Sequence, residues 1–268
     1  MTERTTGGRA AEFAALHHGS EPLLLPNAWD HASAELLAQS GFRAVATTSL
    51  GVAAAAGRPD GARLTREETL RVARSLGTGD FLLSVDAEDG YSDDPDEVAA
   101  FVVELARAGA VGVNLEDGRP GGTLTDAAVH AAKIAAVKAA VPDLFVNART
   151  DTYWLKVDVG ETAGRLGAYR DAGADGVFVP GLGEPEAAKG LVEEIGLPLN
   201  LLYRPGGPSI AELGGLGVRR VSLGSLLYRT ALGAALQAAE AIRRGKSVGL
   251  DAPGYAQVQG LSMDDGGS

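Results

Sequence analysis

An eightfold alternation of short apolar runs and longer helical patterns limits the possible folds of this chain most strongly. Each run has four to six residues, which suits a buried strand and is too short for a helix. The predicted strands cover residues 23–26, 44–48, 81–85, 111–115, 144–147, 176–179, 197–202 and 220–223. The predicted helices cover residues 30–39, 66–75, 95–107, 126–140, 161–171, 185–194, 209–213 and 225–244. This pattern predicts an α/β fold, a single closed (β/α)8 TIM barrel; an open doubly wound sheet is the alternative and usually has fewer strands.

Turn and capping residues support these boundaries. Thr65 stands three residues before Glu68, which is the spacing of a capping box. Pro95 falls in the first turn of a predicted helix, where its missing N–H is tolerated. Glycines at positions 41, 109, 173 and 196 each follow the end of a predicted helix, as a left-handed C-cap requires.

The C-terminal part of the chain differs from the rest. Residues 226–241 are mostly Leu and Ala, and this composition favours a buried packing helix, with a helix exchanged between subunits as the alternative. The following residues are rich in glycine and polar side chains. We therefore expect a barrel domain over residues 1–245 and a flexible or partner-packed tail over residues 246–268.

Composition excludes several classes of protein. The net charge of the 268 residues is −11, so nucleic acid is a poor partner, because binding it needs a basic face. The chain has no cysteine, which excludes disulfides, thiolate nucleophiles and cysteine-based zinc sites. Neither an apolar signal core nor a run of membrane-spanning length is found. We expect a cytoplasmic enzyme with no membrane partner, whose anionic ligand needs a metal or a placed arginine.

Polar side chains gather where the predicted strands end, and in a barrel these ends form one mouth that carries the active site. Asp86 and Glu88 follow the third strand, two residues apart, and Glu116 follows the fourth. Together these carboxylates are able to hold a hard divalent cation, directly or through water. The alternatives are an acidic turn before a helix for the first pair and a helix cap for Glu116.

Two further groups suit an anionic substrate. Arg149, after the fifth strand, offers a planar donor fork for a carboxylate or phosphonate, although it is also placed to form a structural ion pair with Asp151. Ser49, Leu50 and Gly51, after the second strand, form either an oxyanion-binding turn or an ordinary βα turn. A metal and amide donors aimed at one oxygen suit a 2-oxo acid that reacts through an enolate. The histidines are read as surface or packing residues; they are His17, His18, His31 and His130.

A series of motifs resembles the isocitrate lyase/phosphoenolpyruvate mutase superfamily, in the same order along most of the chain. The motifs are Pro-Asn-Ala-Trp-Asp at 26–30, Thr-Thr-Ser at 47–49, Gly-Arg-Pro-Asp-Gly at 57–61, Asp-Ala-Glu-Asp-Gly-Tyr at 86–91, Asn-Leu-Glu-Asp at 114–117, Asn-Ala-Arg-Thr-Asp at 147–151 and Arg-Arg-Val-Ser-Leu-Gly at 219–224. Each motif is weak alone, but their succession at barrel spacing is specific.

The resemblance implies a Mg2+-dependent barrel, with Mn2+ as a substitute, that acts on 2-oxo or 2-hydroxy carboxylates by making or breaking C–C or P–C bonds. It implies Asp86 as the direct metal ligand, within a water-mediated shell of Glu88, Glu116 and Asp60. Arg149, Asp60 and Glu116 are then the candidate catalytic residues. The implied substrate contacts are the Ser49–Gly51 segment with its Leu50 and Gly51 amides, Asp86, Arg149 and Asn200. The family often exchanges its last helix within dimers and tetramers, so we expect a homodimer or homotetramer.

The chain departs from the family after the fourth strand. Lyases of the family carry a Lys-Lys-Cys-Gly-His loop there, whereas residues 116–125 read Glu-Asp-Gly-Arg-Pro-Gly-Gly-Thr-Leu-Thr, and the lysine- and asparagine-bearing loop of the mutase is not recognisable. We therefore expect a Mg2+-dependent lyase that forms an enolate, for which oxaloacetate decarboxylation is one suitable reaction. The alternatives are a phosphonomutase or phosphonopyruvate hydrolase and, from another class, a 2-oxo acid binding protein without turnover.

Overall fold

The computed structural model describes residues 6–247, 249 and 252–262. Their strands form a parallel sheet in the order β1-β11-β10-β9-β8-β5-β4-β3-β2, with a separate antiparallel hairpin, β6–β7. The sheet strands are β1 (Leu23–Leu25), β2 (Asn27–Ala28), β3 (Ala44–Thr47), β4 (Leu82–Asp86), β5 (Ala110–Glu116), β8 (Phe145–Arg149), β9 (Gly176–Phe178), β10 (Leu199–Leu202) and β11 (Arg220–Ser222). The hairpin consists of β6 (Gly118–Arg119) and β7 (Thr123–Leu124).

The two ends of this sheet belong to one strand, because β1 and β2 are separated only by Pro26. Proline has no N–H to donate to a ladder. β1 pairs with β11 and β2 pairs with β3, and the Ala46 N–H donates to the Pro26 carbonyl at 2.8 Å. The first strand therefore closes the ring, and the predicted (β/α)8 barrel is confirmed.

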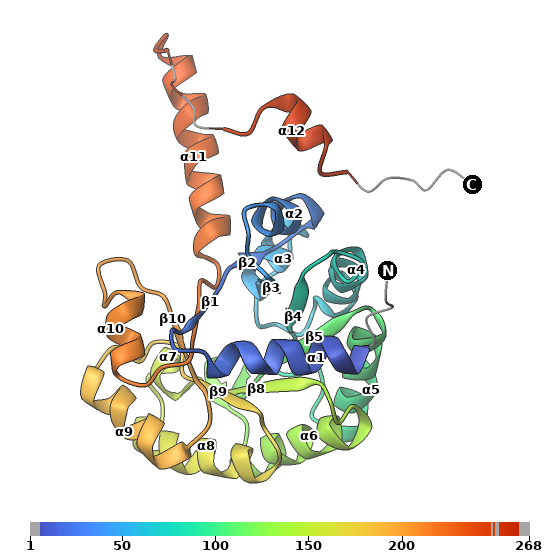
Figure 1. Cartoon of the computed structure of the whole chain (residues 1–268), viewed down its shortest axis with the longest axis vertical. Coiled ribbons are helices and arrows are strands. Elements are labelled where there is room, and N and C mark those ends of the chain that lie inside the picture. The colour runs from blue at the N-terminus through green and yellow to red at the C-terminus, as the bar shows by residue number, and fades with distance from the viewer. Residues whose placement is uncertain (1–5, 248, 250–251, 263–268) are drawn as a thin grey trace.

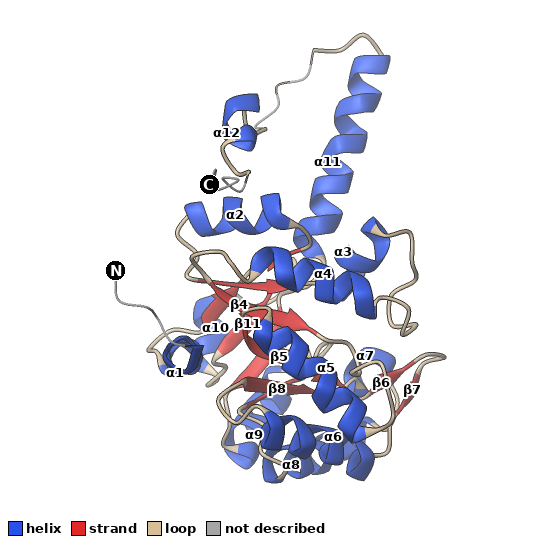
Figure 2. Cartoon of the chain, turned by 90° about the vertical axis from the view of Figure 1, so that its right-hand side faces the viewer, coloured by secondary structure: helices blue, strands red, loops and turns tan. Residues whose placement is uncertain are grey.

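A ring of helices surrounds the barrel (Figures 1 and 2). The predicted helices are all present, with ends that differ from the prediction by at most two residues: α2 (His31–Gln39), α4 (Arg66–Leu76), α5 (Pro95–Arg107), α6 (Ala127–Ala140), α8 (Thr162–Asp171), α9 (Pro185–Ile195), α10 (Ile210–Gly215) and α11 (Leu226–Arg243). Four further helices were not predicted: α1 (Thr6–Ala15), α3 (Ser49–Ala55), α7 (Thr152–Leu155) and α12 (Tyr255–Gln259). Short 3-10 turns occur at Leu16–His18 and Val159–Glu161.

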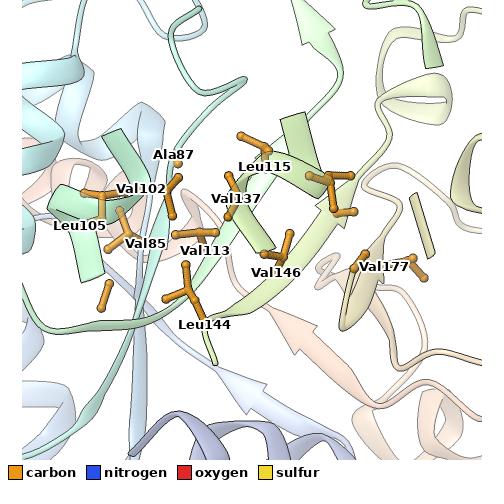
Figure 3. Close-up of a cluster of buried hydrophobic side chains, with 14 of the residues drawn as sticks. Val85, Ala87, Val102, Leu105, Val113, Leu115, Val137, Leu144, Val146 and Val177 are labelled. Carbon is orange, nitrogen blue, oxygen red and sulfur yellow. The ribbon is translucent and has the colours of Figure 1, made fainter. Parts of the chain in front are cut away.

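The main core lies between the sheet and the helices, and Figure 3 shows part of it. Val85, Val113 and Val146 point outward from β4, β5 and β8 and pack with Val102 of α5 and Val137 of α6. Side chains alternate between the two faces of a strand. Ser84 and Asp86 on β4 therefore point into the barrel, as do Asn114 on β5 and Asn147 on β8.

Helix α1 closes the N-terminal end of the barrel. Phe13 is fully buried in a second apolar cluster with Leu82, Val111 and Phe145, each at or next to the start of its strand. The ring of His17 stacks on Phe145 with centroids 4.1 Å apart, and burial lowers the pKa of His17 to about 3. His17 is thus a neutral packing residue. The candidate active site lies at the opposite end of the barrel.

Helix α11 stands away from the barrel in Figures 1 and 2, and none of its residues is buried within the described chain. Leu232, Leu236 and Ile242 expose 54%, 62% and 63% of their surface. The interpretation of α11 as a buried packing helix is therefore wrong for the single chain. In the predicted tail beyond α11, residues 248, 250–251 and 263–268 lie outside the described residues. One described tail residue contacts the barrel domain, since His31 Nε2 of α2 donates to the Leu261 carbonyl at 2.8 Å. Among the described helices, none has the length and hydropathy that a membrane span requires.

Candidate active site

A cavity of about 750 Å³ opens at the C-terminal ends of the strands. Several predicted site residues line it, and they come from four neighbouring strands or the segments that follow them: Ser49, Leu50 and Asp60 after β3, Asp86 on β4, Glu116 on β5 and Arg149 on β8. The structure therefore brings these residues to one mouth. Glu88, Gly51 and Asn200 do not line the cavity, and their positions are described below.

Asp86 ends strand β4 with a carboxylate that is only partly satisfied. Its N–H donates to Thr47 Oγ1 at 2.8 Å, and its Oδ2 accepts from the Ser49 N–H at 3.2 Å. Its Oδ1 is buried and has no hydrogen-bond partner among the described residues. A buried carboxylate oxygen without a donor is costly unless a cation or another ligand group reaches it.

Glu88 lies behind Asp86 in a backbone conformation that few side chains adopt. Its φ is +48°, and its side chain is almost fully buried, with 2% exposed. Oε1 accepts from the hydroxyls of Thr65 and, at 3.2 Å, Tyr91, whereas the buried Oε2 has no partner within the described chain. Burial, and then the charges of Asp86 and Asp60, raise the pKa of Glu88 to about 7. Such strain in a buried carboxylate is characteristic of a functional site.

Asp60 reaches the mouth from the loop between α3 and α4. Although the residue is exposed, its partial desolvation in the mouth and the charge of Asp86 raise its pKa, while a hydrogen bond with Ser49 opposes that rise. The charge of Asp86 thus contributes to the raised pKa of both Asp60 and Glu88. Like charges held together in this way are stabilised by a bound cation.

Glu116 and Arg149 face each other across adjacent strands β5 and β8. Arg149 Nη1 lies 2.6 Å from Glu116 Oε2, and its Nε and Nη2 donate to the two oxygens of Asp151 at 2.6 and 3.1 Å. Burial lowers the pKa of Arg149, but Asp151 and Glu116 more than offset this effect, so its pKa is raised. Burial raises the pKa of Glu116, and the positive charge of Arg149 opposes this rise. The predicted Arg149–Asp151 ion pair is present, and it orients the guanidinium in the cavity wall.

These carboxylates fit a water-mediated cation site better than a fully chelating one. Within the described parts of the chain, no three His, Asp or Glu side chains converge closely enough to hold an ion by themselves. Mg2+ commonly keeps several waters and binds through one or two carboxylates. The unpartnered oxygens of Asp86 and Glu88 are donors of the type that such an ion takes, and Asp60 lies near enough to help raise the pKa of Glu88.

The predicted Ser49–Gly51 turn is wrong, since these residues form the first turn of helix α3. N–H groups in a first turn have no partner within the helix, so donors are still available there. Gly51 itself is packed too tightly for a side chain, because an added Cβ would lie 2.7 Å from Thr48 Cγ2 and 3.0 Å from Trp29 Cβ. Glycine therefore lets the start of α3 pack closely against Thr48 and Trp29.

Asn200 lies below the mouth. It is fully buried, and its Nδ2 donates to Ser222 Oγ at 3.0 Å, while Ser222 lines the cavity. Arg220, also fully buried, donates to Ser222 Oγ at 3.2 Å and to Asn114 Oδ1 at 3.1 Å. These side chains form a polar layer under the site in place of the usual branched apolar residues of a barrel interior.

Sequence reasoning missed the supporting roles of Arg220 and Asp117. Asp117 is fully buried and accepts from Tyr169 at 2.6 Å, from Thr150 at 2.8 Å and from the Asp151 N–H at 2.8 Å. It thereby fixes Asp151, which in turn orients Arg149. For Arg220 the sequence did hold a signal, because this charged residue stands at an inward-facing position of a predicted barrel strand.

Residues 13–243 match the family model described as phosphoenolpyruvate phosphomutase. The chain belongs to the PEP mutase family. The resemblance found in the motifs is therefore confirmed.

Three relatives show the range of the family around this member. An uncharacterized protein of Mycobacterium tuberculosis is 46% identical over 254 residues, covering 94% of this chain and 96% of the relative. The oxaloacetate decarboxylase of Paraburkholderia xenovorans is 30% identical over 253 residues, covering 89% and 83%. The crystal structure of phosphoenolpyruvate phosphomutase from Streptomyces platensis superposes with a TM-score of 0.84 at 26% identity, covering 94% of each chain. The relatives with a named activity are thus enzymes of the lyase and mutase kinds.

In this PEP mutase family member, the segment after Asp117 is the hairpin β6–β7, at the position of the lyase loop that the sequence lacks. Arg119, Pro120, Gly121 and Gly122 of this hairpin line the cavity. The hairpin therefore borders the site, and its charged side chain is Arg119.

Replacing Arg149 by lysine is expected to weaken binding of an anionic ligand about tenfold or more, since a point charge cannot reproduce the planar donor fork. Calorimetric titration of malate in the presence of Mg2+ measures this change. The same exchange at Arg74, an exposed residue of α4 outside the cavity, is the control. A dissociation constant near that of the unaltered protein for Arg149→Lys would contradict the assignment.

Proposed function

We propose that this protein is a Mg2+-dependent lyase that cleaves a C–C bond in a small 2-oxo or 2-hydroxy carboxylate, with oxaloacetate decarboxylation as the leading reaction. The observation that carries the proposal is the buried Asp86 Oδ1, which has no partner among the described residues and belongs to the cavity that Arg149 also lines, with the similarly unpartnered Glu88 Oε2 behind it. When bound, Mg2+ would supply a Lewis acid that polarises the substrate oxygens. Mn2+ has similar ligand preferences and is expected to substitute.

The residues of the chain have separate tasks in this proposal. Asp86 would hold the ion, with Glu88, Glu116 and Asp60 holding its water shell. The Leu50 and Gly51 amides and Ser49, at the start of α3, would donate to the substrate oxygens. Arg149 would bind the carboxylate with the N–H groups that Glu116 and Asp151 leave free.

The altered hairpin supports decarboxylation over reactions that need an acid on this loop. In oxaloacetate decarboxylation the C3–C4 bond breaks, CO2 leaves, and the electron pair passes into an enolate between C3 and the 2-oxo oxygen. A proton then arrives at C3, and water is able to supply it. The 30% identity to an oxaloacetate decarboxylase over most of the chain supports the same reaction.

The competing reaction is phosphonate chemistry, which the likeness to phosphoenolpyruvate phosphomutase favours. A panel of 2-oxo acids, 2-hydroxy acids and phosphonopyruvate, assayed with Mg2+ and with EDTA, separates the candidates. We expect pyruvate from oxaloacetate with Mg2+ only. If the phosphorus NMR signal of phosphonopyruvate moves to that of a product after the protein is added, the mutase or hydrolase is favoured instead. Mg2+-dependent binding without any product would favour a binding protein.

We also propose that residues 1–245 form the catalytic unit and that α11 packs against a second copy of the chain in a homodimer or homotetramer. Replacing Leu236 by aspartate should shift the protein to monomers, because it places a charge on the exposed apolar surface of α11. Light scattering after size-exclusion chromatography measures the mass. Gln237→Asp is the control on a neighbouring exposed position, and an unchanged assembly of the Leu236 variant would count against the interface.

A further inference from the structure

The cavity at the mouth continues into a side chamber outside the ring of strands. Asn200 on β10 turns inward and donates to Ser222 at 3.0 Å, so the next residue, Leu201, turns outward toward the helices. Ser222 and Leu201 nevertheless line the same cavity. The cavity therefore extends past the end of β10 into the space between this strand and the helices that cover it.

The side chamber lies between α9 and α10, which are neighbours on the outside of the barrel (Figure 1). Its wall is apolar and comes from β10, from both helices and from the residues next to them: Leu182, Pro185, Ala188, Leu201, Leu213 and Leu216. Ala188 and Leu201 expose only 2% and 3% of their surface, so the chamber reaches the core. The whole cavity of about 750 Å³ lies in the upper part of the range for pockets that enclose drug-sized ligands, about 300–1,000 Å³.

One cation, Arg204, stands at the rim of this chamber. Its guanidinium lies against the backbone next to Leu182, because an added Cβ on Gly183 would be 2.4 Å from Arg204 Nη1. Within the described chain, the guanidinium has no ion-pair or hydrogen-bond partner. Glu184 also lines the cavity, but its Oε2 accepts from the Gly183 N–H at 3.1 Å. Arg204 is therefore free to bind an anion.

The chamber and the mouth differ in the ligand that each suits. The mouth combines carboxylates with Arg149 and suits a small polar acid with a metal ion. The chamber combines an apolar wall with one unpaired guanidinium, whose planar fork matches a carboxylate. This combination is complementary to an aliphatic chain that ends in a carboxylate, because the chain leaves water while the charge stays at the rim.

We propose that the chamber between α9 and α10 is a separate binding site for an aliphatic monocarboxylate of medium chain length. The carboxylate pairs with Arg204, and the chain lies against the apolar wall around Leu201 and Ala188. This site needs no metal, and it goes beyond the proposed function without depending on it.

Calorimetric titration of hexanoate in EDTA tests the site in the absence of a metal. Binding should strengthen about tenfold from butanoate to hexanoate, because each buried CH2 group strengthens binding about fourfold at most. Hexan-1-ol has the same chain without the charge and should bind about tenfold more weakly than hexanoate, since it lacks a charge-assisted contact.

Two variants separate the contribution of the charge from that of the wall. Arg204→Gln should weaken hexanoate about tenfold and leave hexan-1-ol unchanged; Lys189→Gln, which removes the same charge from an exposed position of α9 outside the cavity, is the control. Ala188→Leu should fill the chamber and weaken both ligands about tenfold or more, whereas Ala187→Leu, outside the cavity lining, should weaken neither. Melting curves report on the fold, and Arg204 is exposed, so its replacement leaves the core intact.

Three results would overturn the inference. The first is a lack of hexanoate binding in EDTA at millimolar concentration, and the second is binding that Arg204→Gln does not weaken. The third is binding that requires Mg2+ and is displaced by malate, since the chain would then belong to a substrate held at the mouth. Each of these results leaves the proposed function standing, because the substrate panel tests that function separately.

Discussion

Replacing Asp86 by alanine is expected to abolish Mg2+-dependent ligand binding and to leave the barrel folded. Asp86 Oδ1 is buried in the mouth without a donor among the described residues, and in the proposed site the neighbouring carboxylates would hold the ion through water. Loss of a direct metal ligand should lower Mg2+ affinity about 100-fold or more, since even outer-shell partners contribute roughly 10- to 100-fold. The hydrogen bond to Thr47 uses the Asp86 backbone N–H and survives the change.

Calorimetric titration of Mg2+, with and without malate, measures the effect, and a melting curve reports on the fold. Asp96→Ala is the control, because it removes the same charge from an exposed position in α5. Unchanged Mg2+ affinity in Asp86→Ala would remove the basis of the site assignment.

Glu88→Gln is expected to stabilise the metal-free protein at alkaline pH. Burial and the charges of Asp86 and Asp60 raise the pKa of Glu88 from 4.5 to about 7. The folded state then binds more protons than the unfolded state between these values, so the free energy of unfolding falls as pH rises through this window. The shift corresponds to a loss of at most about 3 kcal/mol above pH 7. Glutamine carries no charge and removes the loss.

Thermal melts in EDTA check this prediction. At pH 8 the variant should melt several degrees higher than the unaltered protein, because about 1 kcal/mol shifts the melting temperature by roughly 2–4 °C in a domain of this size. At pH 4 the two should melt together, since Glu88 is then protonated in both folded and unfolded chains. Glu186→Gln, at an exposed position of α9, is the control. A variant that melts lower than the unaltered protein at pH 8 would show that ionised Glu88 is already stabilised without a metal.

The barrel was predictable from the sequence because each strand and helix has its own periodicity and stop signal. Pro95 and Gly109 mark boundaries through local backbone chemistry that needs no tertiary context. Helix α1 was missed because it is short, has two glycines at its start and carries only one large apolar residue. That residue, Phe13, packs against the N-terminal end of the barrel, a tertiary contact that the local sequence does not indicate. Helix α11 was misread because an Ala- and Leu-rich composition does not tell whether the apolar surface packs within one chain or against another.

The residues at the mouth of the site were predictable from the sequence, whereas the positions of the buried residues around it were less so. Residues directly after parallel strands must share one end of the barrel, which placed Asp86, Glu116 and Arg149 together at the cavity. The alternation along a strand places Glu88 beside Asp86, but the strand ends at Asp86 and the left-handed backbone of Glu88 turns it inward. Asn200 instead joins the buried layer around Arg220, which depends on contacts between distant strands.

The proposed metal site is tested most directly by the anomalous diffraction of crystals grown with saturating Mn2+. We expect a peak about 2 Å from a carboxylate oxygen of Asp86, with waters bridging the ion to Glu88, Glu116 and Asp60. We also expect malate added to the same crystals to bind at this ion and at Arg149. A peak elsewhere, or no peak at the mouth, would contradict the proposed metal-dependent site.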